Sequence, residues 1–289
     1  MTRIRYFVLA AMVLLSTHVL AMDDDSPSNY IFGKVMSTYK SMQTYKAQGT
    51  VLSDIDTGAI KMNIKTSFSI ILQKPNLYLI SWTQENMPMP GMSQSGAVWS
   101  DGTQPYLYMG VMKAYSKMSS DEIALSSATG ISSGAALTIP SLFLSVFGQS
   151  DPFSRLKDPI IEKTEKVGEE DCYVISGAST ISKKETFWIS KEKYLILKYS
   201  RSLELPAERM EMPEMTDEQL TETLKGAGQE VTEENKQKMR EMTNKTREIL
   251  KTIKGSFTET HMEISSPKMS KKDFQFALPE GTVLKDALF

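Results

Sequence analysis

The chain has 289 residues, with 33 Lys or Arg against 35 Asp or Glu, and its formal net charge is −2. This slightly acidic balance excludes the electrostatic attraction on which nucleic-acid binding depends. Cys172 is the single cysteine and the histidines are His18 and His261, so the sequence excludes an internal disulfide and the usual zinc ligand sets.

Residues 1–21 have the pattern of a secretory signal peptide. Arg3 and Arg5 precede a mostly apolar run, and Val19-Leu20-Ala21 ends in a small residue suited to cleavage. An uncleaved membrane anchor is the alternative, but the run is shorter than the roughly 20 residues that a span needs. We therefore expect cleavage after Ala21, export to the periplasm, and a mature domain over residues 22–289.

The first predicted element of this domain is a helix from Pro27 to about Tyr45, capped by Ser26 or Ser28. A strand begins at Gly49, and a turn at Asp56-Thr57-Gly58 leads to a longer strand. In that strand the side chains of one face are mostly apolar: Ile60, Met62, Ile64, Thr66, Phe68, Ile70 and Leu72. Strict alternation over this length predicts a large curved antiparallel sheet or open barrel with one apolar side.

The middle of the chain predicts more strands and then two helices. Strands are expected over Asn76–Thr83, Ala97–Ser100 and Pro105–Lys117, and a short helix is expected from Ser120 to Gly130. Pro140 opens a second helix, which ends at Gly148 and is apolar on almost all sides. Such a helix must be buried or cover an apolar surface.

Strands resume at Ile160 and include a hairpin formed by Glu185–Ile189 and Tyr194–Ser200. Residues 205–254 interrupt this series with two helices capped by Thr216 and Thr232, and we interpret them as a surface insertion. A strand over Phe257–Ser265 and a tail close the domain. The predicted fold class is mainly β with helices (α+β).

The order of these elements resembles the LolA-like superfamily, which includes lipoprotein carriers and the RseB amino-terminal domain. The motifs are Tyr45-Lys46-Ala47-Gln48-Gly49-Thr50-Val51, the hairpin containing Thr186-Phe187-Trp188-Ile189-Ser190 and Leu195-Ile196-Leu197-Lys198, and the tail from Phe274 to Thr282. The resemblance covers about Tyr30 to Leu288 without the insertion. It implies an unclosed antiparallel half-barrel with helices as a lid over a hollow that takes acyl chains.

From the two-faced strand, the apolar helix and this resemblance we expect an exported binding protein for a lipid or lipoprotein acyl chain. The role would be lipid or lipoprotein transport in the cell envelope, without enzyme activity or a cofactor. The expected lining is Met62, Ile64, Phe68 and Ile70 on the strand, with Leu142, Phe143 and Val146 on the lid. Gly130, Gly134 and Gly148 are the expected hinges of the lid.

Three other interpretations stay open at the level of the sequence. The half-barrel could have a filled core, and the 205–254 insertion would then bind a partner protein of the envelope. Soft methionine sulfurs at Met87, Met89 and Met92, with Met210, Met212 and Met215, could bind Cu(I). Gly130-Ile131-Ser132-Ser133-Gly134 matches the G-x-S-x-G motif of hydrolases, with His261 as its possible base.

Overall fold

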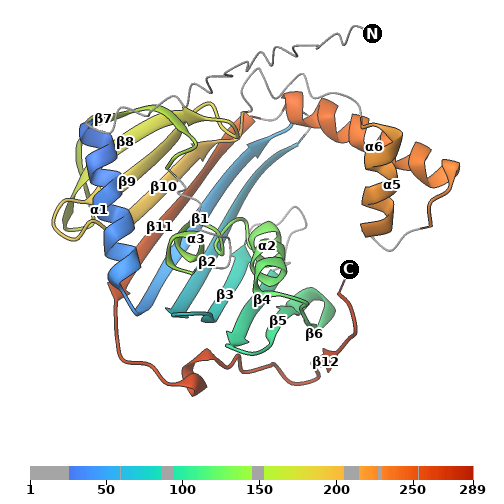
Figure 1. The fold of residues 1–289 in the computed structure, drawn as a ribbon, viewed down its shortest axis with the longest axis horizontal. Helices are drawn as coiled ribbons and strands as arrows, with labels where there is room; N and C mark the ends of the chain where they lie inside the picture. Colours follow the sequence, from blue (N-terminus) through green and yellow to red (C-terminus); the bar gives the residue numbers. More distant parts are fainter. Residues whose placement is uncertain are drawn as a thin grey trace, which may run out of the picture.

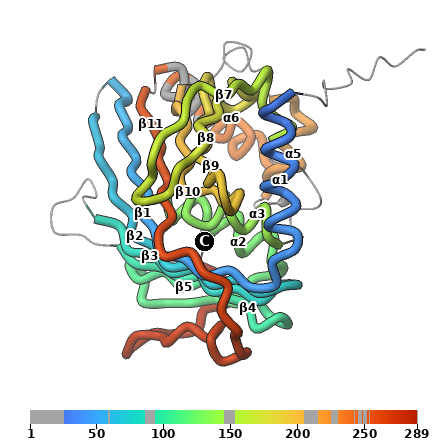
Figure 2. Tube along the Cα trace, turned by 90° about the vertical axis from the view of Figure 1, so that its left-hand side faces the viewer, coloured from blue at the N-terminus to red at the C-terminus, as the bar shows by residue number. Residues whose placement is uncertain are grey.

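The computed structural model describes residues 26–58, 60–85, 94–144, 153–204, 215–226, 230–252 and 254–288. The expected signal peptide therefore lies outside the described residues. One sheet of 12 strands, in the order β12-β6-β5-β4-β3-β2-β1-β11-β10-β9-β8-β7, forms most of the fold. It curves around one face without closing, and helices lie on that concave face (Figures 1 and 2).

The strands are β1 (Thr44–Asp56), β2 (Lys61–Gln73), β3 (Leu77–Glu85), β4 (Gln94–Asp101), β5 (Pro105–Met109), β6 (Ala114–Lys117), β7 (Leu156–Val167), β8 (Glu170–Ser179), β9 (Glu185–Ser190), β10 (Ile196–Ser202), β11 (Lys254–Ser265) and β12 (Val283–Leu284). The helices are α1 (Pro27–Ser41), α2 (Asp121–Ile131), α3 (Thr138–Phe143), α5 (Asp217–Gly226) and α6 (Glu233–Thr252), with short 3-10 turns at η1 (Gly110–Met112) and η3 (Lys271–Phe274). The expected α+β half-barrel with a helical insertion is confirmed.

Strand β2 has the two faces that its alternation predicts. Thr66, Phe68, Ile70 and Leu72 are buried on the concave side, whereas the residues between them are half-buried. Burial decreases towards the start of the strand. The apolar face is therefore covered at the Leu72 end and more open at the Met62 end.

Helix α1 begins where the sequence predicts, because the Ser26 hydroxyl accepts a hydrogen bond from the Asn29 backbone N–H at 3.2 Å. It ends at Ser41 rather than near Tyr45, because Tyr45 belongs to β1 and pairs with Leu72. Its buried apolar stripe consists of Ile31, Phe32, Val35 and Tyr39. Burying each of these large side chains contributes roughly 1.5–3 kcal/mol, so α1 is firmly docked.

The single strand expected over Pro105–Lys117 is wrong. The chain forms β5, turns through η1 with Lys113 at a positive φ of 45°, and returns as β6. Tyr108 then pairs with Tyr115 across the hairpin. The apolar residues continue through the turn, so hydrophobic pattern alone did not reveal the reversal.

The insertion forms a helical hairpin, α5 packed on α6, that projects from one rim of the sheet (Figure 1). Leu220 and Leu224 are buried within it, and Arg240 of α6 forms an ion pair with Asp217 of α5. The insertion therefore has a small core of its own.

After β11 the chain crosses the end of the sheet, where η3 packs against β3 and β4 (Figure 1). Phe276 packs on Trp99 and Tyr108 with ring centroids 5.5 and 5.3 Å apart, and β12 pairs in parallel with β6. Trp99 and Tyr108 alternate with the concave residues Val98 and Leu107. The tail therefore covers an aromatic cluster on the convex face.

Candidate functional site

The concave face is covered by α2, the turn after it and α3, which together we call the lid (residues 121–144; Figure 1). Side-chain hydrogen bonds attach the lid to the sheet and to the turn before β3, where the Asn76 amide donates to Asp121 at 3.2 Å. Tyr78 donates to Asp121 at 2.9 Å, and Gln84 of β3 donates to the Ser133 hydroxyl at 2.8 Å. The Thr138 hydroxyl donates to the Glu259 carboxylate of β11. The lid is thus fastened at its start, at its turn and at the beginning of α3.

The lid buries small residues as well as the large side chains Leu125, Ile139, Phe143 and Leu144. Ala124 and Ala128 face the core from α2, and Ala135 and Ala136 do so from the turn. Gly134 has a φ of 95°, and a Cβ there would lie 2.7 Å from the Phe257 ring of β11. Small side chains make fewer dispersion contacts than the aromatic residues of α1. Helix α2 therefore contacts the sheet through one large buried side chain, Leu125, together with small residues and hydrogen bonds.

The residues predicted to line the cavity lie at different depths. Phe68 and Ile70 are 5% and 0% exposed and Phe143 is 2% exposed, whereas Met62, Ile64 and Leu142 are half-buried. Val146 and the expected hinge Gly148 lie outside the described residues. Of the other two expected hinges, Gly130 lies within α2 and Gly134 lies in the turn. A side chain next to a water-filled hollow would retain exposed surface, so the structure is packed around Ile70 and Phe143.

The predicted set does not form one compact cluster. The Phe143 ring lies 6.3 Å from that of Tyr45 and 4.8 Å from the Lys74 ammonium, at the Leu72 end of β2. Met62 is ten residues away along the same strand, a distance of roughly 33 Å at the usual rise per residue. Lid helix α3 therefore covers the deep end of the apolar face, while Met62 and Ile64 lie towards its open end.

A buried polar chain under the lid was not predicted. His261 Nε2 lies 2.9 Å from Glu259 Oε1 without the alignment of a hydrogen bond, and Tyr45 Oη lies 3.3 Å from His261 Nδ1. The side chains of Glu259 and His261 are fully buried. The sequence signal for this polar chain is the spacing of Phe257, Glu259 and His261. Residues at i, i+2 and i+4 lie on one face of a strand, so a buried Phe257 places Glu259 and His261 on the buried face too.

Other polar atoms beneath the lid have no partner. Among the described residues, the Thr66 hydroxyl, the Trp82 indole N–H and the Ser132 hydroxyl are buried without a hydrogen bond. Each such group costs about 1–3 kcal/mol relative to a satisfied one. The closed arrangement of lid and sheet is therefore apolar but imperfectly matched.

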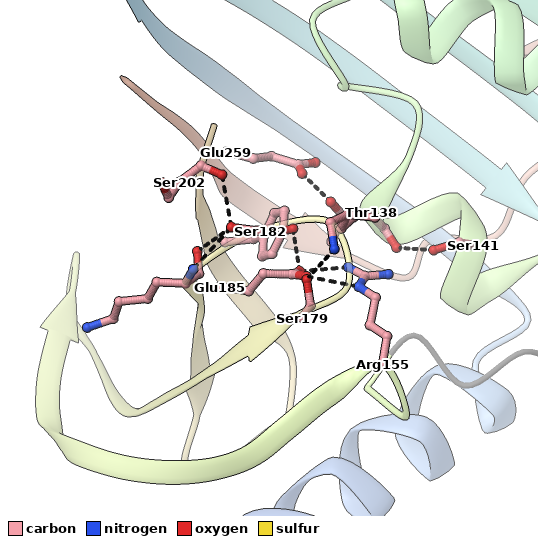
Figure 3. A network of polar contacts seen from close by, with 11 residues as sticks. Thr138, Ser141, Arg155, Ser179, Ser182, Glu185, Ser202 and Glu259 are labelled. Atoms are coloured by element: carbon pink, nitrogen blue, oxygen red, sulfur yellow. Dashed lines mark hydrogen bonds and ion pairs between the residues drawn. The ribbon is translucent and has the colours of Figure 1, made fainter. Parts of the chain in front are cut away.

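A second polar network pins the start of β7 to the concave face of β9 (Figure 3). Arg155 donates to Glu185 from Nε at 3.1 Å and from a terminal nitrogen at 2.8 Å, and Tyr199 donates to Glu185 at 2.6 Å. Burial alone would raise the pKa of Glu185, but the hydrogen bonds and charge of Arg155 outweigh it and hold the pKa below its usual value. Glu185 is therefore a buried carboxylate with its counterion in place.

The hydrolase arrangement is not formed at Ser132. A nucleophile elbow needs a strand before the serine and a helix after it, but helix α2 precedes Ser132. The Ser132 hydroxyl is buried, and the His261 ring contacts Glu259 and Tyr45 instead. Ser132 serves as the C-cap residue of α2, where its backbone N–H donates to Ala128 at 2.8 Å.

The described residues contain no group of three or more His, Cys, Asp or Glu side chains that could hold a metal ion. Met87, Met89, Met92, Met210 and Met212 of the copper hypothesis lie outside the described residues. Met215 is described, and its sulfur accepts a contact from the Thr243 hydroxyl at 3.8 Å. No helix within the described ranges has the length and hydropathy needed to cross a membrane.

Two pockets among the described residues are lined by no residue of the lid. One of about 350 Å³ is lined by Val167, Gly168, Glu170, Lys193, Leu195, Leu197 and residues 260–264 of β11. The other, of about 330 Å³, is lined by Ser67, Phe68, Ser69, Ser81, Trp82, Thr83, Ser95, Gly96 and Phe276. Its serine and threonine side chains alternate with the concave residues, so it opens on the convex face. Among the predicted lining residues that the structure describes, Phe68 alone borders either pocket.

No protein-family model matches the chain, and no curated protein has a detectably similar sequence. Among solved structures, it is similar to an uncharacterized conserved protein from Thermus thermophilus, with 8% identity over 90% of this chain and 99% of that one, and a TM-score of 0.43. The lipoprotein LppX of Mycobacterium tuberculosis shares 11% identity over 84% and 99% of the two chains, with a TM-score of 0.40. A LolA superfamily protein from Nitrosomonas europaea shares 10% identity over 86% and 96%, with a TM-score of 0.30.

One of these matches thus bears the name of the superfamily that the sequence motifs resemble. At these identities a ligand or partner does not transfer from one protein to another. The proposals below therefore depend on the residues of this chain.

Proposed function

We propose that this chain binds an apolar ligand, a lipid or an acyl chain, between the lid and the concave face of its half-barrel. We further propose that residues 1–21 direct its export to the periplasm, where it takes part in lipid or lipoprotein transport. Met62, Ile64, Phe68 and Ile70 would contact the ligand from β2, and Leu142, Phe143 and Val146 would contact it from the lid side.

The observation that carries this proposal is the composition of the interface between lid and sheet. A broad apolar surface lies on one side, and α2 covers it with one large buried side chain, Leu125, with two alanines and with a few hydrogen bonds. Unpaired polar atoms at Thr66, Trp82 and Ser132 make the closed state costly. An apolar ligand that displaced α2 would keep the concave side chains out of water. Replacing α2 by the ligand therefore exposes little apolar surface of the sheet.

Binding is tested directly with the purified full-length protein. Native mass spectrometry of protein isolated from cells is expected to show co-purified lipid, and delipidated protein is expected to bind a fluorescent fatty acid. A protein that is consistently empty and that leaves the fluorescent probe unbound would contradict the proposal.

Gly134→Ala tests whether the lid must move. The added methyl group would collide with Phe257, and the positive φ adds strain of order 1–3 kcal/mol, so the lid should open more often. We expect the rate of probe uptake to rise about tenfold. Gly168→Ala is the matched control, because Gly168 also has a positive φ, of 58°, and has no neighbour within 4 Å of the added Cβ.

A second candidate function is partner binding by the α5–α6 insertion, while the half-barrel keeps a filled core. The packing of Ile70 and Phe143 and the projection of the helical hairpin from the rim favour it. The Leu203 N–H donates to the Gly255 carbonyl at 3.0 Å, so a short Gly-Ser linker can replace residues 205–253. That replacement should abolish capture of an envelope partner by the purified protein and leave fatty-acid binding unchanged; a partner that is still captured refutes this function.

A further inference from the structure

Among the described residues, Arg201 on the concave face has no counterion. Arg201 of β10 is two residues from Tyr199, so both side chains lie on the same side of the strand. The Arg201 guanidinium carbon lies 5.3 Å from the centre of the Phe257 ring, and its Nε is buried without a hydrogen bond in the described part of the chain. No ion pair to Arg201 occurs among the described residues, and the residue is half-buried. A half-buried guanidinium without an anion is unfavourable.

The neighbouring carboxylate does not satisfy Arg201. Strand register places Arg201 opposite Glu185, but that carboxylate already accepts two hydrogen bonds from Arg155 and one from Tyr199. Arg155 therefore neutralises Glu185, and Arg201 is the second arginine beside a single glutamate. In the adjacent row, Glu259 accepts a hydrogen bond from the Thr138 hydroxyl, and its other carboxylate oxygen lies 2.9 Å from His261 Nε2.

Arg201 also lies at a defined place relative to the lid and the apolar surface. Register pairs Arg201 with Phe257, Phe257 with Ser53, and Ser53 with Ile64, so these residues form one row across the concave face. The lid turn at Gly134 contacts the Phe257 ring from above. Arg201 is therefore at the margin of the lid, with aromatic surface beside it and the half-buried Ile64 about three strand spacings, roughly 14 Å, away.

We propose that Arg201 binds the anionic group of an amphipathic ligand, a carboxylate or a phosphate, whose apolar chain lies beneath the lid. A guanidinium presents paired N–H donors that fit either group, and charge-assisted bonds of this kind are stronger than neutral ones. This inference rests on the proposed function and specifies its ligand as an anionic amphiphile with one end at the margin of the lid.

The experiment compares three ligands with the same 16-carbon chain: palmitate, palmitoyl lysophosphatidate and hexadecanol. Delipidated full-length protein should bind the two anions at least tenfold more tightly than the alcohol. Arg201→Gln should remove this preference and leave the affinity for hexadecanol unchanged. Lys198→Gln is the matched control, because Lys198 has the same charge on the same strand but contacts Trp188 on the opposite face.

The outcomes separate this inference from the proposed function. Equal affinity of the wild-type protein for all three ligands overturns the role of Arg201 and leaves lipid binding standing. An Arg201→Gln protein that still binds the anions more tightly than hexadecanol also overturns the role of Arg201 and leaves lipid binding standing. Failure to bind any of the three ligands overturns both proposals. Preference for lysophosphatidate over palmitate, or the reverse, identifies the anionic group, and Arg201→Lys tests the effect with the charge retained.

Discussion

Replacing Arg155 with leucine is expected to lower the free energy of unfolding by about 3–5 kcal/mol. Arg155 supplies two hydrogen bonds and the counterion to Glu185, whose side chain is 0% exposed. Without Arg155 the carboxylate stays buried without the two hydrogen bonds of its counterion, so it must take up a proton or draw the neighbouring Arg201 into the place of Arg155. Chemical denaturation followed by circular dichroism measures the change.

The pH dependence gives a second test of the same pair. The Arg155 pair holds the folded-state pKa of Glu185 below its unfolded value, so this stabilisation is present above the unfolded pKa. It is lost as the pH falls through the lower, folded-state pKa. The deficit of Arg155→Leu should therefore be largest at neutral pH and shrink in acid, where the carboxyl group of the variant is protonated.

Lys183→Leu is the control for Arg155→Leu. Lys183 forms an ion pair with Glu204 at 2.8 Å, but both side chains are exposed. Such surface pairs contribute about 0–1 kcal/mol. A loss of less than 1 kcal/mol in Arg155→Leu, equal to that of Lys183→Leu, would show that the buried network does not stabilise the fold.

Trp82→Ala is expected to cost about 3–5 kcal/mol, because it removes a large buried side chain from the concave face. The Trp82 ring occupies the space above Gly96, where an added Cβ would lie 2.3 Å from the indole. Gly96→Ala alone should therefore cost about 1–3 kcal/mol through overpacking. In the double variant the methyl group finds the space that the indole leaves.

The double-mutant cycle makes this argument quantitative. The combined loss should be smaller than the sum of the single losses by at least about 1 kcal/mol, since the two groups compete for one space. Additive losses would mean that Trp82 and Gly96 do not share that space. The cavity left by Trp82→Ala lies on the face that the lid covers, so this variant should also bind the fluorescent fatty acid in greater amount.

Local pattern in the sequence was sufficient for the elements that make the apolar face. Period-two alternation from Ile60 to Leu72 predicts β2 and its buried side, and Ser26 with Pro27 predicts the start of α1. These signals depend on backbone geometry and on neighbours within a few residues. The Pro105–Lys117 segment failed for the same reason, because its apolar residues continue through a turn that pattern alone does not mark.

The site depends on contacts between residues far apart in the chain, which local pattern does not encode. Thr138 and Glu259 are separated by 121 positions, and Tyr45 and His261 by 216. The pairing of β1 with β11 brings Glu259 and His261 beneath the lid. Arg155 forms the ion pair with Glu185, the carboxylate that lies opposite Arg201. A charged side chain on a strand is assigned to solvent by pattern, whereas its true environment depends on which distant segment covers it. Alternation along β2 was thus enough to predict an apolar concave surface. The packing of distant segments decided that the lid covers this surface and that Arg201 lies at its margin without an anion from the described residues.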